Sequence, residues 1–157
     1  MVPKKIKKTL EIIYSKLKDK NIKWVLVGSL SLALQGVKIR PKDIDILTDK
    51  KGAFEINKIL KEYQKKAVKF KKSKFFKSYF GEFNIGGVKV EIMGNLREKV
   101  NNRWFSFSKR LISPKIVKFG NISVPVSSLK DQLKSYERGN RKKDLIYAKK
   151  IREALKI

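Results

Sequence analysis

Two short motifs in this sequence bring together residue types that can bind a metal ion and a phosphate group. Gly28 and Ser29 end the apolar run Trp24–Val27, and a small-residue turn at the start of a helix commonly holds phosphate. Asp43 and Asp45 follow after a spacer; in a strand, residues two apart share a face, so both carboxylates would point one way. Two adjacent carboxylates repel each other unless a cation, usually Mg²⁺, lies between them. The motifs predict a site for a metal-bound nucleoside triphosphate.

The order of these motifs resembles the signature of the nucleotidyltransferase superfamily with the DNA polymerase β-like fold. That signature is a hydrophobic residue with Gly-Ser, a spacer, and two acids separated by one hydrophobic residue. Here it is Val27-Gly28-Ser29 and then Asp43-Ile44-Asp45-Ile46. The resemblance extends from Lys23 to about Ala148, and the C-terminal part looks like the small bacterial and archaeal branches. Those branches include AbiEii-type toxins and the lincosamide and minimal nucleotidyltransferases.

The resemblance implies a Mg²⁺-dependent (or Mn²⁺-dependent) transfer and assigns the acids. Asp43 and Asp45 would hold the nucleotide-bound ion and share a second ion with Glu91, in the two-metal scheme for phosphoryl transfer. Glu91 lies in the strand-like run Val88–Met93, where alternation places it opposite the core. It would bind metal or act as the base for the acceptor hydroxyl. Glu82 on the neighbouring strand is a competing third acid.

The nucleotide-binding residues are expected before the acids. Ser29 would contact the β- and γ-phosphates, and Gly28 would let the backbone approach them closely. Arg40 would either neutralise triphosphate charge or brace the turn before Asp43. An ordinary strand-to-helix turn with Ser29 as its N-cap remains the alternative for the glycine–serine pair.

The charge of the chain indicates a polyanionic partner. Forty Lys and Arg residues oppose 14 Asp and Glu residues, a formal net charge of +26, and such an excess favours nucleic-acid binding. Aromatic residues interleave with the basic ones, which suits RNA. A solvated basic surface without a ligand is the alternative. The expected RNA-binding residues form two clusters: Lys65, Lys66, Lys69, Lys71 and Lys72, and then Arg138, Arg141 and Lys142.

Composition limits the class of protein. The 157 residues are 41% hydrophobic, enough for one domain over 1–157 with a folded core. With no cysteine and no histidine, disulfides, thiol chemistry and histidine bases are excluded. The absence of an apolar run of membrane-spanning length predicts a cytoplasmic protein. Richness in lysine and isoleucine without cysteine suits a heat-loving source.

The pattern of elements predicts an α+β fold, a mixed β-sheet flanked by helices with the polymerase β-like core and C-terminal helices. Residues 95–113 show no clear pattern. The expected elements are an amphipathic helix within 1–20, strands at 23–27 and 44–47, a helix at 51–63, hairpins 74–85/88–93 and 115–119/122–126, and two helices within 127–157.

The functional expectation is transfer of a nucleoside monophosphate from an NTP to a hydroxyl, with RNA such as tRNA as the expected acceptor. Two alternatives stay open. One is a nucleotidylyltransferase acting on a small molecule, for which so large a positive charge serves no purpose. The other is a catalytically silent nucleic-acid-binding domain or a protein partner of the toxin–antitoxin type.

Overall fold

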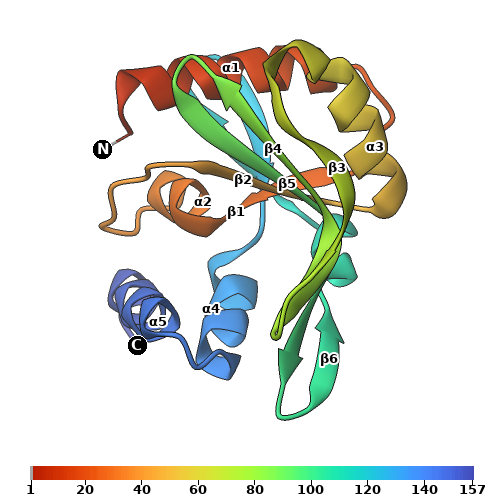
Figure 1. Ribbon diagram of the computed structural model, residues 1–157. Helices are drawn as coiled ribbons and strands as arrows, with labels where there is room; N and C mark the ends of the chain where they lie inside the picture. Colours follow the sequence, from red (N-terminus) through yellow and green to blue (C-terminus); the bar gives the residue numbers. More distant parts are fainter. Residues whose placement is uncertain (1) are drawn as a thin grey trace.

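A mixed β-sheet forms the centre of the protein, as the computed structural model of residues 2–157 shows (Figure 1). Its strands are β1 Trp24–Val27, β2 Ile44–Thr48, β3 Gln64–Lys72, β4 Phe76–Ile85, β5 Val88–Val100, β6 Arg103–Ser106, β7 Lys115–Phe119 and β8 Ile122–Val126. They lie in the order β3-β4-β5-β2-β1-β8-β7, and β6 pairs with β5. β2 runs antiparallel to β1 but parallel to β5, and β8 runs parallel to β1. The expected α+β class is confirmed.

Helices cover the sheet on both sides. They are α1 Lys4–Leu17, α2 Gly28–Leu34, α3 Lys50–Ile59, α4 Leu129–Arg138 and α5 Lys142–Leu155, with short 3-10 turns η1 Lys61–Tyr63 and η2 Ser108–Leu111. α3 ends earlier than the sequence suggested, because the chain leaves helical geometry at Leu60 and tightens into η1.

The main core lies between one face of the sheet and the helices α1 and α3. The side chains of α1 that recur at helical spacing, Ile6, Leu10, Ile13 and Leu17, are all buried there. Alternate strand residues meet them, including Ile44 and Ile46 of β2 and Val90 and Ile92 of β5. Since side chains alternate across a strand, the residues between them, Asp45 and Glu91, leave the sheet from the opposite face.

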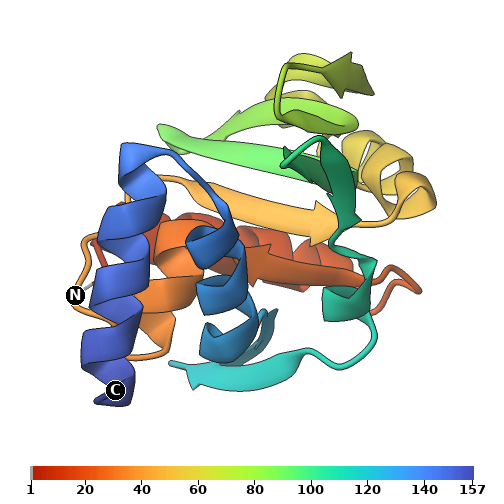
Figure 2. The ribbon, with the colours of Figure 1, turned by 90° about the horizontal axis from the view of Figure 1, so that it is seen from below.

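That opposite face is only partly covered. Val25, Val27 and Leu47 pack there against Phe107, next to η2. A smaller cluster of Leu32, Val37, Leu133, Ala148 and Ile151 joins α4 and α5 to the α2 region. Figure 2 shows α4 and α5 side by side on this side of the sheet. The space that remains between these parts contains the candidate site.

β5 continues through a Gly94-Asn95 pair that reads as a turn in the sequence. Gly94 is needed for another reason: a β-carbon there would lie 2.7 Å from Cβ of Ala53 on α3, so the glycine lets helix and strand approach. Asn95 adopts a left-handed conformation with φ 52°, which Asn tolerates better than most residues. The strand then reaches Val100 and turns at Asn101 and Asn102 into β6.

The glycine pair Gly86-Gly87 does form the expected hairpin between β4 and β5. Both residues have positive φ, 61° and 81°, and the N–H of Gly87 donates to Oδ1 of Asn84 at 3.1 Å. Of the helices in residues 2–157, none is long and apolar enough to cross a membrane.

Candidate active site

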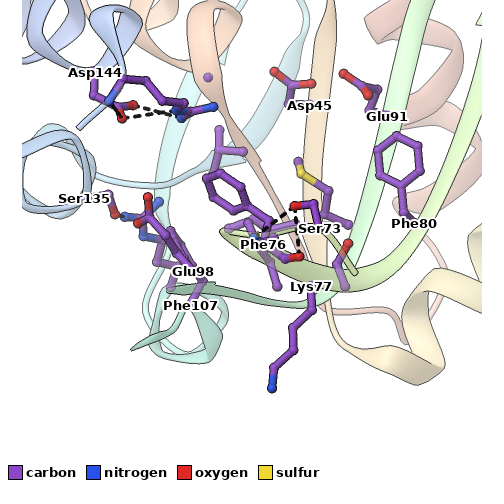
Figure 3. A pocket seen from close by; sticks show the side chains of 18 of the residues that line it. Asp45, Ser73, Phe76, Lys77, Phe80, Glu91, Glu98, Phe107, Ser135 and Asp144 are labelled. Carbon is purple, nitrogen blue, oxygen red and sulfur yellow. Dashed lines mark hydrogen bonds and ion pairs between the residues drawn. The ribbon is translucent and has the colours of Figure 1, made fainter. Parts of the chain in front are cut away.

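Asp45 and Glu91 are register partners on the neighbouring parallel strands β2 and β5. Their side chains therefore leave the sheet side by side on the same face, as Figure 3 shows. Asp43 immediately precedes β2 and is half-buried. Period-2 alternation thus places these acids as the sequence predicted, with the isoleucines between them in the core.

Glu82 extends the same acidic row by one strand. It is the register partner of Glu91 on β4, and Lys66 of β3 is its own partner on the other side. Glu91 is adjacent to Asp45, whereas Glu82 is separated from Asp45 by the whole of β5. The order of the strands favours Glu91 as the third acid.

Gly28 touches the carboxylate of Asp45 without an intervening side chain. A β-carbon at Gly28 would lie 2.5 Å from Oδ2 of Asp45, closer than carbon and oxygen can approach. Gly28 also has φ 74°, the left-handed region in which glycine is favoured. β1 can therefore turn into α2 directly against the acid only with glycine at this position.

Gln132 of α4 holds this turn from the far end of the chain. Its Oε1 accepts a hydrogen bond from the N–H of Gly28 at 3.1 Å. Its Nε2 donates to Oγ of Ser31 and to the carbonyl of Ser127, both at 2.8 Å. The side chain is buried, so α4 and the Gly28 turn are tied by satisfied buried polar groups.

Lys89 supplies the positive charge next to the acids. Its Nζ lies 3.9 Å from Oδ2 of Asp43 and 3.8 Å from Oε1 of Glu91. All three side chains are partly exposed, so these are screened ion pairs. Lys89 thus lies where a bound cation would also be attracted.

The electrostatics of the site bear most strongly on Asp45. Burial, together with the negative charges of Glu91 and Asp43, raises the pKa of Asp45 from 3.8 to about 7. Lys143 and Lys89 oppose the shift but do not cancel it. A carboxylate that is hard to ionise in the free protein is one whose charge a cation would stabilise.

The donor set fits a hard divalent ion. Asp43, Asp45 and Glu91 offer carboxylate oxygens, the ligands that Mg²⁺ and Mn²⁺ prefer. Within residues 2–157, no three acids already stand close enough to hold one ion between them, and Lys89 bridges two of the three. The site therefore has the right donors but needs side-chain rearrangement to close on a metal.

A pocket of about 360 Å³ opens beside the acids, between the sheet, η2 and the helices α4 and α5 (Figure 3). Aromatic and apolar side chains make up much of its wall, and charged groups alternate with them. The apolar members are Val27, Leu47, Phe76, Phe80, Met93, Leu96, Phe107 and Tyr136; the charged members are Asp45, Lys71, Lys77, Glu91, Glu98, Arg110, Arg141, Lys143 and Asp144.

Asp144 has a structural role in this wall. Its carboxylate accepts from the backbone N–H of Arg141 at 3.1 Å and from the guanidinium at 2.8 and 3.1 Å. These bonds close the first turn of α5 as a capping box. They also hold Arg141, whose guanidinium lies 5.0 Å from the centre of the Phe76 ring.

The other predicted residues fall in different places. Ser29 is half-buried in the first turn of α2, and Arg40 is exposed in the loop before β2, outside the pocket wall. Lys71 and Arg141, one from each basic cluster, both line the pocket. Lys65, Lys66, Lys69 and Lys72 are exposed on β3, Lys142 is exposed on α5, and Arg138 stacks on Phe105.

Several site residues escaped sequence reasoning. Gln132 had one usable signal: it lies on the same stripe of α4 as Leu129, Leu133 and Tyr136, where a polar residue is unexpected. Glu98 and Arg110 lie in the stretch that had no periodic pattern, so the sequence contained no comparable signal for them.

Comparisons with known proteins agree with this geometry. The model of the aminoglycoside-2''-adenylyltransferase family matches residues 9–151. A solved structure from Thermotoga maritima, assigned as a nucleotidyltransferase, is 35% identical, with 99% of this chain and 96% of that one covered and a TM-score of 0.84. No curated protein matches the chain.

Two more distant structures share the fold. The lincosamide adenylyltransferase LnuA with lincomycin bound is 14% identical over 98% of both chains, with a TM-score of 0.60. ANT(2'')-Ia in complex with adenylyl-2''-tobramycin is 9% identical over 94% of this chain and 88% of that one, with a TM-score of 0.56. The chain is a nucleotidyltransferase and belongs to the aminoglycoside-2''-adenylyltransferase family.

Proposed function

We propose that this nucleotidyltransferase transfers a nucleoside monophosphate from a metal-bound NTP to a hydroxyl group of RNA. The pairing of Asp45 with Glu91 on adjacent strands, with Gly28 directly against Asp45, carries the catalytic part of the proposal. It puts two carboxylates and a glycine turn at one point of the pocket wall.

Asp43, Asp45 and Glu91 are the residues that would hold Mg²⁺ or Mn²⁺, which supplies neutralisation of phosphate charge and activation of the hydroxyl. Gly28 lets the turn pass directly against Asp45, and Ser29 follows it with a hydroxyl that could contact a phosphate. Lys143 adds positive charge near Asp45 from α5. Glu91 is the candidate acceptor of the proton that leaves the attacking hydroxyl.

The position of the β3 lysines supports RNA as the acceptor. Lys66, Lys69 and Lys71 are the register partners of Glu82, Phe80 and Ser78 on β4. Cross-strand partners share a face, so these lysines project on the side of the sheet that carries the acids. A path of positive charge thus leads along the sheet to the pocket, as a polyanion would require.

A second basic feature extends over β3, β4, β5 and β6. The ammonium groups of Lys77, Lys99 and Lys72 lie 4.1, 5.8 and 5.9 Å from the ring centre of Trp104. Desolvation and the neighbouring cations, Arg97 first, lower the pKa of Lys77. Crowded cations around an aromatic face suit a strand of RNA, whose phosphates relieve the repulsion while a base stacks.

A small-molecule acceptor is the second candidate, and the enclosed part of the pocket favours it. The distant structural relatives LnuA and ANT(2'')-Ia contain lincomycin and adenylyl-2''-tobramycin. A pocket of about 360 Å³ is within the size range of small-ligand sites. The excess of positive charge, however, disfavours any cationic acceptor.

Transfer of label from α-labelled NTPs tests both candidates. Wild type, Asp43→Asn and Asp45→Asn would be incubated with Mg²⁺ or Mn²⁺ and with bulk tRNA, protein or a set of small hydroxyl compounds. Asp19→Asn, the same change at an exposed position away from the site, is the matched control. Label in RNA with wild type and Asp19→Asn, but not with the site variants, is expected. Label in the small compounds alone would overturn the RNA acceptor.

A further inference from the structure

Glu98 is a buried carboxylate with no function in the chemistry described so far. Only 5% of its surface is exposed, yet it lines the same pocket as Asp45 and Glu91. Its Oε1 is fully buried and has no hydrogen-bond partner. Since buried polar atoms are normally paired, Glu98 is a pocket-lining carboxylate that still lacks a hydrogen-bond donor.

Three arginines lie near Glu98, but its Oε1 has no hydrogen-bond partner among them. Arg138, Arg141 and Arg110 all act on its charge, whereas burial and the negative charge of Asp144 raise its pKa. Arg110 itself is engaged elsewhere, donating to the carbonyl of Asp131 at 2.9 Å and to Oγ of Ser135. The arginines compensate the charge of Glu98 while leaving its acceptor oxygen unused.

Two flat aromatic rings flank this end of the pocket. Phe76 is the register partner of Glu98 on β4, and Phe107 follows β6. Each ring has a guanidinium on one face, Arg141 at 5.0 Å from the Phe76 centre and Arg110 at 4.6 Å from the Phe107 centre. Figure 3 shows Phe76 between Glu98 and Asp45, and Phe107 beside Glu98.

We propose that the end of the pocket around Glu98 binds a nucleobase. The flat rings of Phe76 and Phe107 offer an apolar contact for a planar heterocycle. The carboxylate of Glu98 accepts from an exocyclic amino group of that base. Adenine, cytosine and guanine have such a group, while uracil offers a single N–H between two carbonyls that a carboxylate repels. This end of the pocket therefore selects bases that have an exocyclic amino group.

The inference rests on the proposed function, because the base belongs to one of its two nucleotide substrates. The source is either the NTP or the terminal nucleotide of the RNA acceptor. Both present the same chemistry to Glu98, and binding measurements on each separate them. Binding also requires no turnover, so these measurements give an answer even if no transfer is found.

The test compares wild type with Glu98→Met, which keeps a similar volume without an acceptor, and Glu98→Gln, which keeps one acceptor without charge. Glu137→Met removes an exposed glutamate on α4 that does not line the pocket and is the matched control. Affinities would be measured calorimetrically for ATP, CTP, GTP and UTP, and for short single-stranded oligoribonucleotides that differ only in the 3′-terminal base.

In one of the two series, wild type is expected to bind the amino-bearing bases at least tenfold more tightly than uracil, because a site built to bond a donor rejects ligands that lack it. Glu98→Met should lose that preference, Glu98→Gln should keep part of it, and Glu137→Met should keep all of it. If the nucleotide series shows the preference, the base belongs to the NTP; if the oligonucleotide series shows it, the base is the terminal nucleotide of the RNA.

Equal binding of CTP and UTP by wild type, together with equal binding of C- and U-ended oligonucleotides, would overturn the inference and needs no variant. A loss of affinity in Glu98→Met that is the same for all four bases would also overturn it, because that is the effect of a structural role. Circular dichroism melts of each variant identify any that fail to fold, in which case the wild-type comparison decides.

Discussion

Gly28 and Asp45 are in contact across the turn that joins β1 to α2: a β-carbon on the glycine would lie 2.5 Å from Oδ2 of the acid. The glycine is thus required twice, by its φ of 74° and by this approach. Gly36 has a similar φ of 91°, but a β-carbon there would meet no atom within 4 Å. Substitutions at these two glycines can therefore distinguish the effect of backbone strain from the effect of displacing Asp45.

Gly28→Ala is expected to lower the transfer rate by about 100-fold, because a catalytic group displaced by about 1 Å loses that much. Gly36→Ala should cost about 1–2 kcal/mol of stability from the left-handed backbone alone and leave the rate within about threefold. Urea unfolding and labelled-NTP kinetics on both variants check this. Equal loss of rate in both would show that backbone strain, and not the contact with Asp45, limits activity.

The pKa of Asp45 predicts how stability depends on pH without divalent ions. The folded protein holds a proton on Asp45 up to about pH 7, while the unfolded chain releases it near 3.8. Stability from this group is therefore present at low pH and falls as the pH rises from about 4 to 7. The full shift corresponds to about 4 kcal/mol, and because Asp45 is partly exposed a loss of about 2 kcal/mol is expected.

Asp45→Asn should remove this slope, so the variant should match wild type near pH 4 and be more stable than wild type at pH 8. Urea unfolding at pH 5, 6, 7 and 8 in the presence of a chelator measures the difference. Parallel curves for wild type and Asp45→Asn would contradict the raised pKa.

Local patterns were sufficient to predict the acids and the turn. Asp45 and Glu91 face away from the core because each lies between buried residues two apart, a property that alternation fixes without knowledge of the fold. The glycine–serine turn likewise follows from an apolar strand that ends in small residues. These features depend on neighbours within a few positions along the chain.

The pocket wall depends on distant contacts and could not be predicted in this way. Gln132 reaches Gly28 over 104 positions, and only the docking of α4 against α2 shows why a glutamine is buried there. Glu98 belongs to a strand that reads as ended at Gly94, because a glycine that permits helix packing looks the same in sequence as one that forms a turn. The fold is needed to distinguish the two.

Lys89 is predicted to compete with the metal ion. Its ammonium lies within 4 Å of both Asp43 and Glu91, and two partly exposed ion pairs of about 0.2–1 kcal/mol each must break before a cation takes its place. Lys89→Gln should therefore bind Mn²⁺ about 2–30 times more tightly than wild type in the absence of nucleotide. Titration followed by electron paramagnetic resonance measures this. A weaker affinity in the variant would show that Lys89 orients the acids for the ion.

Gln132 is predicted to position the Gly28 turn. Gln132→Met keeps the approximate volume but leaves the N–H of Gly28 and the hydroxyl of Ser31 without this partner, which should cost about 1–3 kcal/mol. Gln132→Glu keeps the acceptor for Gly28 and loses the two donors, so its transfer rate should stay above that of Gln132→Met. Urea unfolding and NTP kinetics test the order. Equal rates in the two variants would remove the link between α4 and the turn.

The β3 lysines should contribute to RNA affinity through their position and not only through their charge. Replacing Lys66, Lys69 and Lys71 with Gln should reduce the slope of log affinity against log salt by about 2, since each phosphate contact on a single strand contributes about 0.7.

The matched control replaces Lys4, Lys5 and Lys8, exposed on α1, with Gln. α1 covers the opposite face of the sheet, so the control removes the same charge away from the acids. Fluorescence anisotropy with labelled single-stranded RNA between 50 and 300 mM salt, about the range in which such contacts are screened, measures both slopes. If both triple variants weaken binding equally, the net charge of the chain, and not the face with Asp45 and Glu91, accounts for the binding. That result would contradict RNA as the acceptor.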